Sequence, residues 1–175
     1  MTPSSKRLFF AIWPQAKVRE RLQQSREMYC PRGGRWTAPE NLHVTLVFLG
    51  NVAVQLIPSI ETAASEIDAN AFGLNLDWLR IAPGKGMVWL APRVVPPELL
   101  ELVDALRSSL SGLDFEIEQR AYRPHMTLIR KMPGIFDQRE IEPVLWPVRS
   151  FALVESRHSR GGSEYIRSRI WRLRE

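Results

Sequence analysis

The sequence predicts an α+β protein of two pseudo-symmetric lobes, each a small, mainly antiparallel sheet with flanking helices, around a central cleft. Two observations lead to this architecture. A four-residue phrase occurs twice, as His43-Val44-Thr45-Leu46 and as His125-Met126-Thr127-Leu128. The order strand, helix, motif strand also occurs twice, and the same fifteen-residue step leads from Met28 to His43 and from Leu110 to His125. Such self-similarity indicates an internal repeat. We therefore expect residues 1–175 to form a single two-lobed domain.

The first half of the chain is expected to form a strand, a helix and the first motif strand. Residues 8–13 are an apolar run that ends at Pro14. Apolar residues then recur at helical spacing from residue 15 to about 28, before the helix breakers Pro31, Gly33 and Gly34. The run HVTLVFLG is short and rich in β-branched and aromatic residues, which predicts a buried strand that Gly50-Asn51 closes.

The rest of the chain predicts two helices and several strands. Residues 55–70 and 96–112 carry apolar stripes with spacings of three and four, which is typical of helices that pack on a sheet. Residues 72–78 alternate like a strand, and Gly84-Lys85-Gly86 predicts a hairpin turn into a strand at 87–90. The second motif strand follows Pro124. Two final strands are expected at about 148–155 and 165–173, joined at Gly161-Gly162.

The composition narrows the class of protein. A net charge of +5 and a pI near 9.9 attract anions, with nucleic acid the obvious large candidate. Cys30 is the only cysteine, so the sequence predicts neither a disulfide framework nor a thiolate zinc site. No apolar run approaches the roughly 20 residues that span a bilayer, and the run after Lys6-Arg7 is too short for a signal peptide. We expect a cytoplasmic monomer with no membrane partner.

The two motifs suggest acid–base chemistry. Because strand side chains alternate, His43 and Thr45 point to one side, as do His125 and Thr127, so both pairs can face one cleft. Free imidazole titrates near 6.5, so one histidine can accept a proton while the other donates one. This division suits in-line attack on a phosphodiester, with the threonine hydroxyls on the non-bridging oxygens and an arginine offsetting the developing charge.

Other kinds of site are less well supported by the sequence. A metal centre needs three or four ligands, and no acidic residue lies at ligand spacing to either motif. The remaining histidine, His158, lies among Ser and Arg residues, where we expect a solvated turn. We find no nucleophile elbow and no Gly-rich phosphate loop. The sequence therefore predicts neither a metal nor another cofactor.

The motifs resemble a known family. The segment PENLHVTLVFLGNV (39–52), the preceding Arg35-Trp36 and the segment RAYRPHMTLIR (120–130) are similar to the two-histidine phosphoesterase superfamily. The resemblance is closest to the RNA 2',3'-cyclic phosphodiesterases, formerly called 2'-5' RNA ligases. The opening KRLFFAIWP, the run MVWL (87–90) and a few residues near the end extend it over nearly the whole chain, namely Ser156, Gly162, Tyr165 and Trp171.

The resemblance implies an α+β fold of two lobes, a metal-free reaction, and RNA ending in a 2',3'-cyclic phosphate as substrate. It implies that His43 is the proton donor and His125 the proton acceptor, that the product is a 2'-phosphomonoester, and that slow 2'-5' ligation of tRNA halves is a side activity. A 2',3'-cyclic phosphate requires a ribose 2'-hydroxyl, which excludes DNA. Two departures are Met126, where a branched aliphatic residue is common, and Ile166, where a hydroxyl residue is frequent.

Supporting residues come from the same segments. Arg130 and Arg120 match basic positions of the family, and one or both are expected to contact the phosphate, the alternative for Arg130 being a solvated side chain. By strict alternation Arg130 falls on the face opposite His125, so it reaches the site only past a β-bulge or at the end of the strand. Trp36 and Tyr122 either stack on the terminal base or pack in the core and anchor a loop. The same alternation assigns Phe48 to the core.

Three functions stay open at this stage. Beside the RNA enzyme, the same site could act on a small cyclic nucleotide or an ADP-ribose cyclic phosphate. The chain could also be a non-catalytic RNA-binding module. A basic C-terminal tail either tracks an RNA backbone or forms a solvated surface. It comprises Arg157, Arg160, Arg167, Arg169, Arg172 and Arg174.

Overall fold

A computed structural model describes residues 4–24, 33–82, 86–113, 117–118, 120–133, 138–159 and 162–175. Its strands are β1 (Ser5–Ile12), β2 (Arg35–Trp36), β3 (Val44–Ala53), β4 (Phe72–Ala82), β5 (Met87–Ala91), β6 (Met126–Arg130), β7 (Arg139–Val148), β8 (Ser150–Ser159) and β9 (Gly162–Arg172). Its helices are α1 (Ala16–Gln24), α3 (Ile57–Ser65) and α4 (Pro97–Leu110), with 3-10 turns at Pro39–Asn41 and Val54–Leu56. Cys30 and most of the expected 84–86 hairpin lie outside the described residues.

In the described residues, all the strands belong to one sheet, with the order β7-β4-β5-β6-β3-β1-β8-β9 and with β2 beside β6. Every strand pair is antiparallel. This confirms the α+β class. The expected lobes correspond to the two half-sheets β3-β1-β8-β9 and β6-β5-β4-β7. In each half-sheet the motif strand, β3 or β6, is the one that lies next to the other half-sheet. A single residue pair, Val44 opposite Met126, joins them edge to edge.

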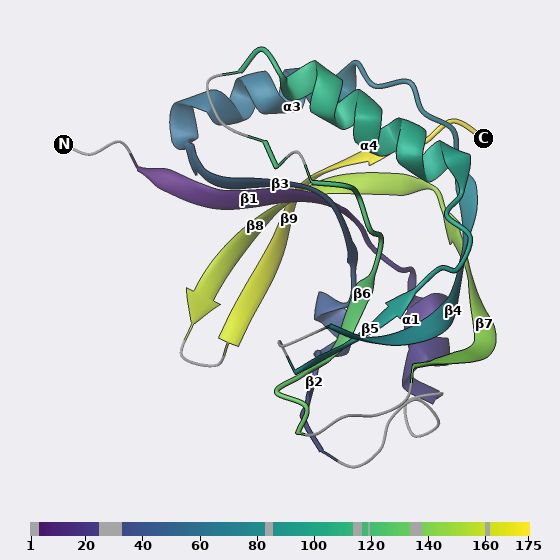
Figure 1. The fold of residues 1–175 in the computed structure, drawn as a ribbon. Coiled ribbons are helices and arrows are strands. Elements are labelled where there is room, and N and C mark those ends of the chain that lie inside the picture. The colour runs from purple at the N-terminus through teal and green to yellow at the C-terminus, as the bar shows by residue number, and fades with distance from the viewer. Residues whose placement is uncertain are drawn as a thin grey trace.

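The helices α1 and α4 each pack against the half-sheet other than the one that they follow in the sequence. Figure 1 shows α3 and α4 lying along each other over one face of the sheet, while α1 lies apart, near β4 and β7. The helix α4 leaves the half-sheet of β5 and contacts β3, whereas α1 leaves the half-sheet of β1 and contacts β7. The apolar stripe of α4 is buried, with Leu99, Leu102 and Leu106 each at 0% exposure. Each such leucine contributes roughly 2 kcal/mol by leaving water.

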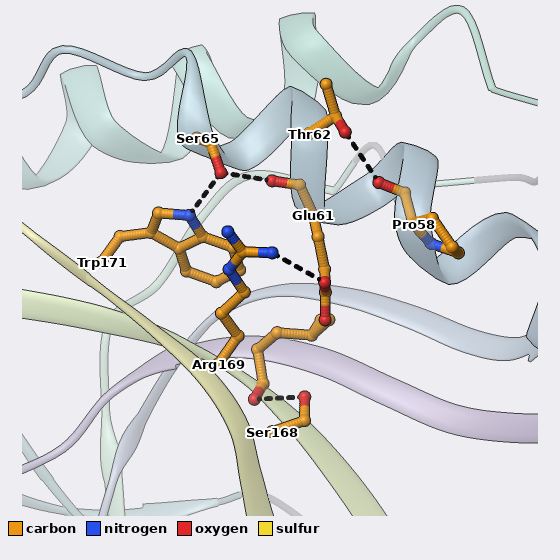
Figure 2. Close-up of polar contacts among 8 residues, drawn as sticks. Pro58, Glu61, Thr62, Ser65, Ser168, Arg169 and Trp171 are labelled. Atoms are coloured by element: carbon orange, nitrogen blue, oxygen red, sulfur yellow. Dashed lines mark hydrogen bonds and ion pairs between the residues drawn. The ribbon is translucent and has the colours of Figure 1, made fainter.

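An ion pair and a side-chain hydrogen bond connect the last strand, β9, to α3 (Figure 2). Arg169 Nη1 lies 2.9 Å from Glu61 Oε2, and Trp171 Nε1 donates to Ser65 Oγ at 2.9 Å. Elsewhere in the expected basic tail, Arg157 pairs with Glu155 at 2.6 Å and Arg174 pairs with Asp68 at 2.7 Å. Arg160 lies outside the described residues. Carboxylates thus neutralise three of the tail arginines, which weakens the hypothesis that the tail tracks RNA.

The structure corrects the expected ends of two elements and adds a strand that the sequence did not predict. The strand β3 continues through Gly50 to Ala53, because Gly50 takes a positive φ of 70° that lets the chain continue to pair with β1. The helix expected over 55–70 is shorter, because α3 ends at Ser65. The strand β7 was not expected from the sequence, because it contains Pro143 and Pro147. Proline lacks an N–H, but among the described residues β7 is an edge strand whose single partner is β4, so the sheet tolerates both prolines.

Candidate active site

The two motif histidines lie where the half-sheets meet, each one residue before its strand begins. His43 Nδ1 is 2.6 Å from the carbonyl oxygen of Asn41, and His125 Nδ1 is 2.8 Å from that of Arg123. A carbonyl oxygen only accepts hydrogen bonds, so each Nδ1 carries the hydrogen and donates it. Each Nε2 is therefore the nitrogen that can exchange a proton with a substrate.

Each imidazole also stacks on a tryptophan that the sequence analysis did not select. The rings of Trp13 and His43 are 4.8 Å apart and inclined by 10°, and those of Trp89 and His125 are 4.0 Å apart and inclined by 27°. Trp13 follows the last residue of β1, and Trp89 lies on β5 opposite Thr127. Only the strand pairing identifies these partners, because neither tryptophan is near its histidine in sequence.

Two aromatic rings besides Trp13 enclose His43. Phe9 and Tyr165 add ring contacts at 5.2 Å and 5.0 Å between centroids. Burial among these rings lowers the pKa of His43 to about 4, an effect that the carbonyl of Asn41 opposes and that the nearby positive charge of Arg130 reinforces. In the free protein at neutral pH, His43 is therefore uncharged.

A β-bulge follows each motif threonine at the same place. In β3, Phe10 pairs with Val47 and Ala11 with Thr45, so Leu46 is an extra residue. In β6, Val88 pairs with Ile129 and Trp89 with Thr127, so Leu128 is the extra residue. A bulge shifts the alternation by one position, and bulges are over-represented beside active sites. The residue three places after each threonine therefore returns to the threonine's face.

The bulge explains where Arg130 and Phe48 lie. Both line the same cleft as the two histidines and the two threonines. Arg130 reaches the site past a bulge, which is the condition that the sequence analysis set. Its prediction that Phe48 belongs to the core was wrong, because Phe48 is 48% exposed. Strict alternation placed the ring on the buried face, and the extra residue at Leu46 moved it to the cleft.

The cleft has a volume of about 1160 Å³. Its walls come from both half-sheets, from the segment before β6, and from the β8 and β9 hairpin. Its arginines are Arg7, Arg35, Arg107, Arg120, Arg123 and Arg130. The acidic residue among the described lining residues is Glu118, which forms an ion pair with Arg120. The cleft is thus strongly cationic and suits an anionic ligand.

The other expected binding residues lie at the cleft in different ways. Trp36 is half-buried and packs against the main core, so packing accounts for most of its surface. Tyr122 also packs against the core, and its hydroxyl donates to the carbonyl oxygen of Thr45 at 3.0 Å. Arg120 is exposed at the rim. The geometry favours the anchoring role for Tyr122 over the stacking role.

The third histidine also lies at the cleft. His158 is exposed as expected, but it belongs to β8 rather than a turn, and it lines the cleft. Within the described ranges, no three His, Cys, Asp or Glu side chains are grouped so that they could hold a metal ion. In the same part of the chain, no helix combines the length and the apolar character required to cross a membrane.

Comparisons with known proteins identify the family of this chain. Residues 12–89 match the model of the LigT-like phosphoesterases. An Escherichia coli K12 protein named RNA 2',3'-cyclic phosphodiesterase is 34% identical over 95% of this chain and 96% of its own length. This chain belongs to the LigT-like phosphoesterase family. A second family member with the same name, from Thermus thermophilus, is 31% identical over 91% of this chain and 86% of its own length.

Solved structures agree with this assignment. The crystal structure of E. coli LigT complexed with 3'-AMP is 31% identical, covers 98% of this chain and 100% of its own, and superposes with a TM-score of 0.89. The crystal structure of TT0787 of T. thermophilus covers 96% of this chain and 98% of its own, with a TM-score of 0.83 and 27% identity. The sequence motifs and the fold therefore lead to the same family.

Proposed function

We propose that this protein is an RNA 2',3'-cyclic phosphodiesterase that hydrolyses a terminal 2',3'-cyclic phosphate to a 2'-phosphomonoester without a metal ion. The observation that carries the proposal is the paired geometry of the histidines. Each has its Nδ1 tied to a backbone carbonyl, which assigns proton exchange to its Nε2, and both line one cationic cleft. The names of the E. coli and T. thermophilus relatives support the substrate class.

In the proposed reaction, His125 accepts a proton from water as the water oxygen attacks phosphorus. The bond from phosphorus to O3' breaks, and His43 gives a proton to O3', so that the phosphate stays on O2'. Thr45, Thr127 and Arg130 bind the non-bridging oxygens and offset their growing charge. His43 is uncharged in the free cleft, so it must gain its proton when the anionic phosphate binds and raises its pKa.

The aromatic part of the cleft supports a place for the terminal base. Phe48 lines the cleft, is 48% exposed and contacts Phe9, with 6.0 Å between ring centroids. A base can stack on such a ring whatever its identity. We assign the base to Phe48 rather than to Trp36 or Tyr122, because those two are packed against the core.

The finer details of the function are also proposals. RNA is favoured over a small cyclic nucleotide or an ADP-ribose cyclic phosphate because the cleft is large, cationic and partly aromatic. With tRNA halves, a 5'-hydroxyl could replace water as the nucleophile and give a 2'-5' bond. We further propose that residues 1–175 act as one two-lobed domain in a cytoplasmic monomer.

The test is to incubate a short oligonucleotide ending in 2',3'-cyclic phosphate with the protein and a chelator, and to identify the product isomer. We expect a 2'-phosphomonoester, and a loss of roughly 10³-fold in kcat for His43→Ala and for His125→Ala. RNA affinity should be nearly unchanged in both variants. A chelator-sensitive rate would point to a metal-bound hydroxide. Turnover that survives both substitutions would refute the two-histidine mechanism.

A further inference from the structure

The positive charge of the cleft is concentrated on the His125 side. Arg35 lies on β2, Arg130 on β6, and Arg120 and Arg123 in the segment that leads to β6. On the His43 side the cleft carries the rings of Phe9, Phe48 and Tyr165 together with one arginine, Arg7 on β1. A substrate that carries both a base and a chain of phosphates therefore meets two chemically different walls.

Arg35 and Arg130 form an unusual pair within this cationic wall. They are direct partners in the β2 and β6 register, so their side chains lie on the same face of the sheet. Among the described residues, neither forms an ion pair with a carboxylate, and the acceptor next to Arg130 Nη1 is the weakly accepting Met87 Sδ at 3.4 Å. Like charges directly opposite each other destabilise a sheet, and a bound anion would remove that cost.

The arginines outside the cleft are differently arranged. Arg169, Arg174 and Arg157 each pair with a carboxylate, and Figure 2 shows the first of these pairs, between Arg169 and Glu61. Arg167 lies over the ring of Trp13, 5.7 Å from its centroid. The charge available to a polyanion is therefore greater at the cleft than along the C-terminal tail.

We propose that Arg35 and Arg123, which we call the arginine flank, bind the phosphodiester that joins the terminal nucleotide to the rest of the RNA. The proposal rests on the proposed function. With the cyclic phosphate between the histidines, the base at C1' and the chain at C5' leave the ribose in different directions. Phe48 takes the base, so the chain leaves over the arginine flank. The volume of about 1160 Å³ exceeds the usual range for a site that holds one small ligand.

The test compares uridine 2',3'-cyclic phosphate with a uridine dinucleotide and a hexanucleotide that end in the same group. We expect the dinucleotide to have a kcat/KM about tenfold above that of the nucleoside, because it adds one charge-assisted phosphate contact. In Arg35→Gln that ratio falls to near one. For the hexanucleotide, the slope of log affinity against log salt concentration becomes shallower by about 0.7, the value for one lost phosphate contact on a single strand.

Arg172→Gln is the matched control, because Arg172 is exposed on β9 and is not among the cleft-lining residues. It should change neither the ratio nor the slope. If the C-terminal tail bound the RNA, Arg172→Gln would lower the ratio and the slope while Arg35→Gln would leave both unchanged, and the proposal would be overturned. Equal kcat/KM values for the nucleoside and the dinucleotide would overturn it as well.

Binding separates this proposal from the proposed function. The affinities of uridine 3'-phosphate and of a hexanucleotide with a 3'-phosphate are measured by calorimetry for the wild type and for Arg35→Gln. If no cyclic phosphate is hydrolysed but the hexanucleotide binds more tightly and loses this advantage in the variant, the enzyme assignment fails and the arginine flank stands. If hydrolysis occurs and the two ligands bind equally well, the flank fails and the enzyme assignment stands.

Discussion

The two motif strands share the same local backbone geometry, but they differ in the side chain that follows each motif threonine by three residues. Both place a histidine just before the strand, tie its Nδ1 to the carbonyl two residues earlier, stack it on a tryptophan and bulge after the threonine. They differ at the residue that the bulge returns to the cleft, which is Phe48 in one strand and Arg130 in the other. The repeated backbone therefore presents a symmetric pair of imidazoles to the cleft, and the side chains that follow make its two sides chemically different.

The largest expected effect separates Arg130 from Phe48. Arg130→Gln removes a positive charge from the place where phosphate charge develops, so kcat/KM should fall roughly 10²-fold, mostly through kcat. Arg130→Lys keeps the positive charge but loses the planar guanidinium with its paired donors. Its kcat/KM should therefore lie between those of the wild type and Arg130→Gln. Phe48→Leu removes a stacking surface, so KM for an oligonucleotide should rise up to about tenfold with kcat little changed.

Steady-state kinetics on the three variants decide whether this asymmetry is functional. A fall in kcat for Phe48→Leu as large as that for Arg130→Gln would mean that the two positions act alike. The comparison between the half-sheets would then describe only their shape.

A second difference between the halves concerns the enclosure of His43, and it predicts a pH-dependent stability. The pKa of His43 is about 4 in the folded protein and close to 6.5 in an unfolded chain. Between these values the unfolded chain binds more protons, so the free energy of unfolding should rise with pH across this window, by up to about 3 kcal/mol. Above about pH 6.5 this contribution is complete, and it is lost as the pH falls toward 4.

Urea unfolding from pH 4.5 to 7.5 measures this slope for the wild type and for His43→Gln. The glutamine variant lacks the titrating ring, so its unfolding free energy should rise less steeply over the same window. Equal slopes in the two proteins would show that His43 is not held uncharged by its aromatic neighbours.

The sequence predicted the symmetric part of the site better than the asymmetric part. Repetition and strand alternation place His43, Thr45, His125 and Thr127 on one cleft, because local periodicity determines which face a residue takes. Phe48 was wrongly assigned to the core, because a one-residue bulge cannot be read from an apolar run. Trp13, Trp89 and Arg35 were missed as site residues, because their roles depend on strand register, which brings distant segments together.

The smallest expected effect concerns the bond that ties the two halves together at the site. Tyr122 lies three residues before His125, and its hydroxyl donates to the carbonyl of Thr45, two residues after His43. Burial raises the pKa of Tyr122, so the hydroxyl keeps its proton and remains a donor. The motif strands themselves share only the pair of Val44 and Met126. The hydroxyl of Tyr122 therefore helps to fix the spacing of the two motif strands, and with it the spacing of the two imidazoles.

Tyr122→Phe should lower the free energy of unfolding by about 1 kcal/mol and reduce kcat several-fold while KM stays the same. Ser168→Ala is the matched control, since it deletes a bond of the same kind, from Ser168 Oγ to the carbonyl of Leu153 at 3.1 Å, away from the cleft. It should cost similar stability in urea unfolding but leave kcat intact. If the two variants lose kcat equally, the bond of Tyr122 stabilises the fold without positioning the histidines, and the spacing of the two halves must depend on the sheet alone.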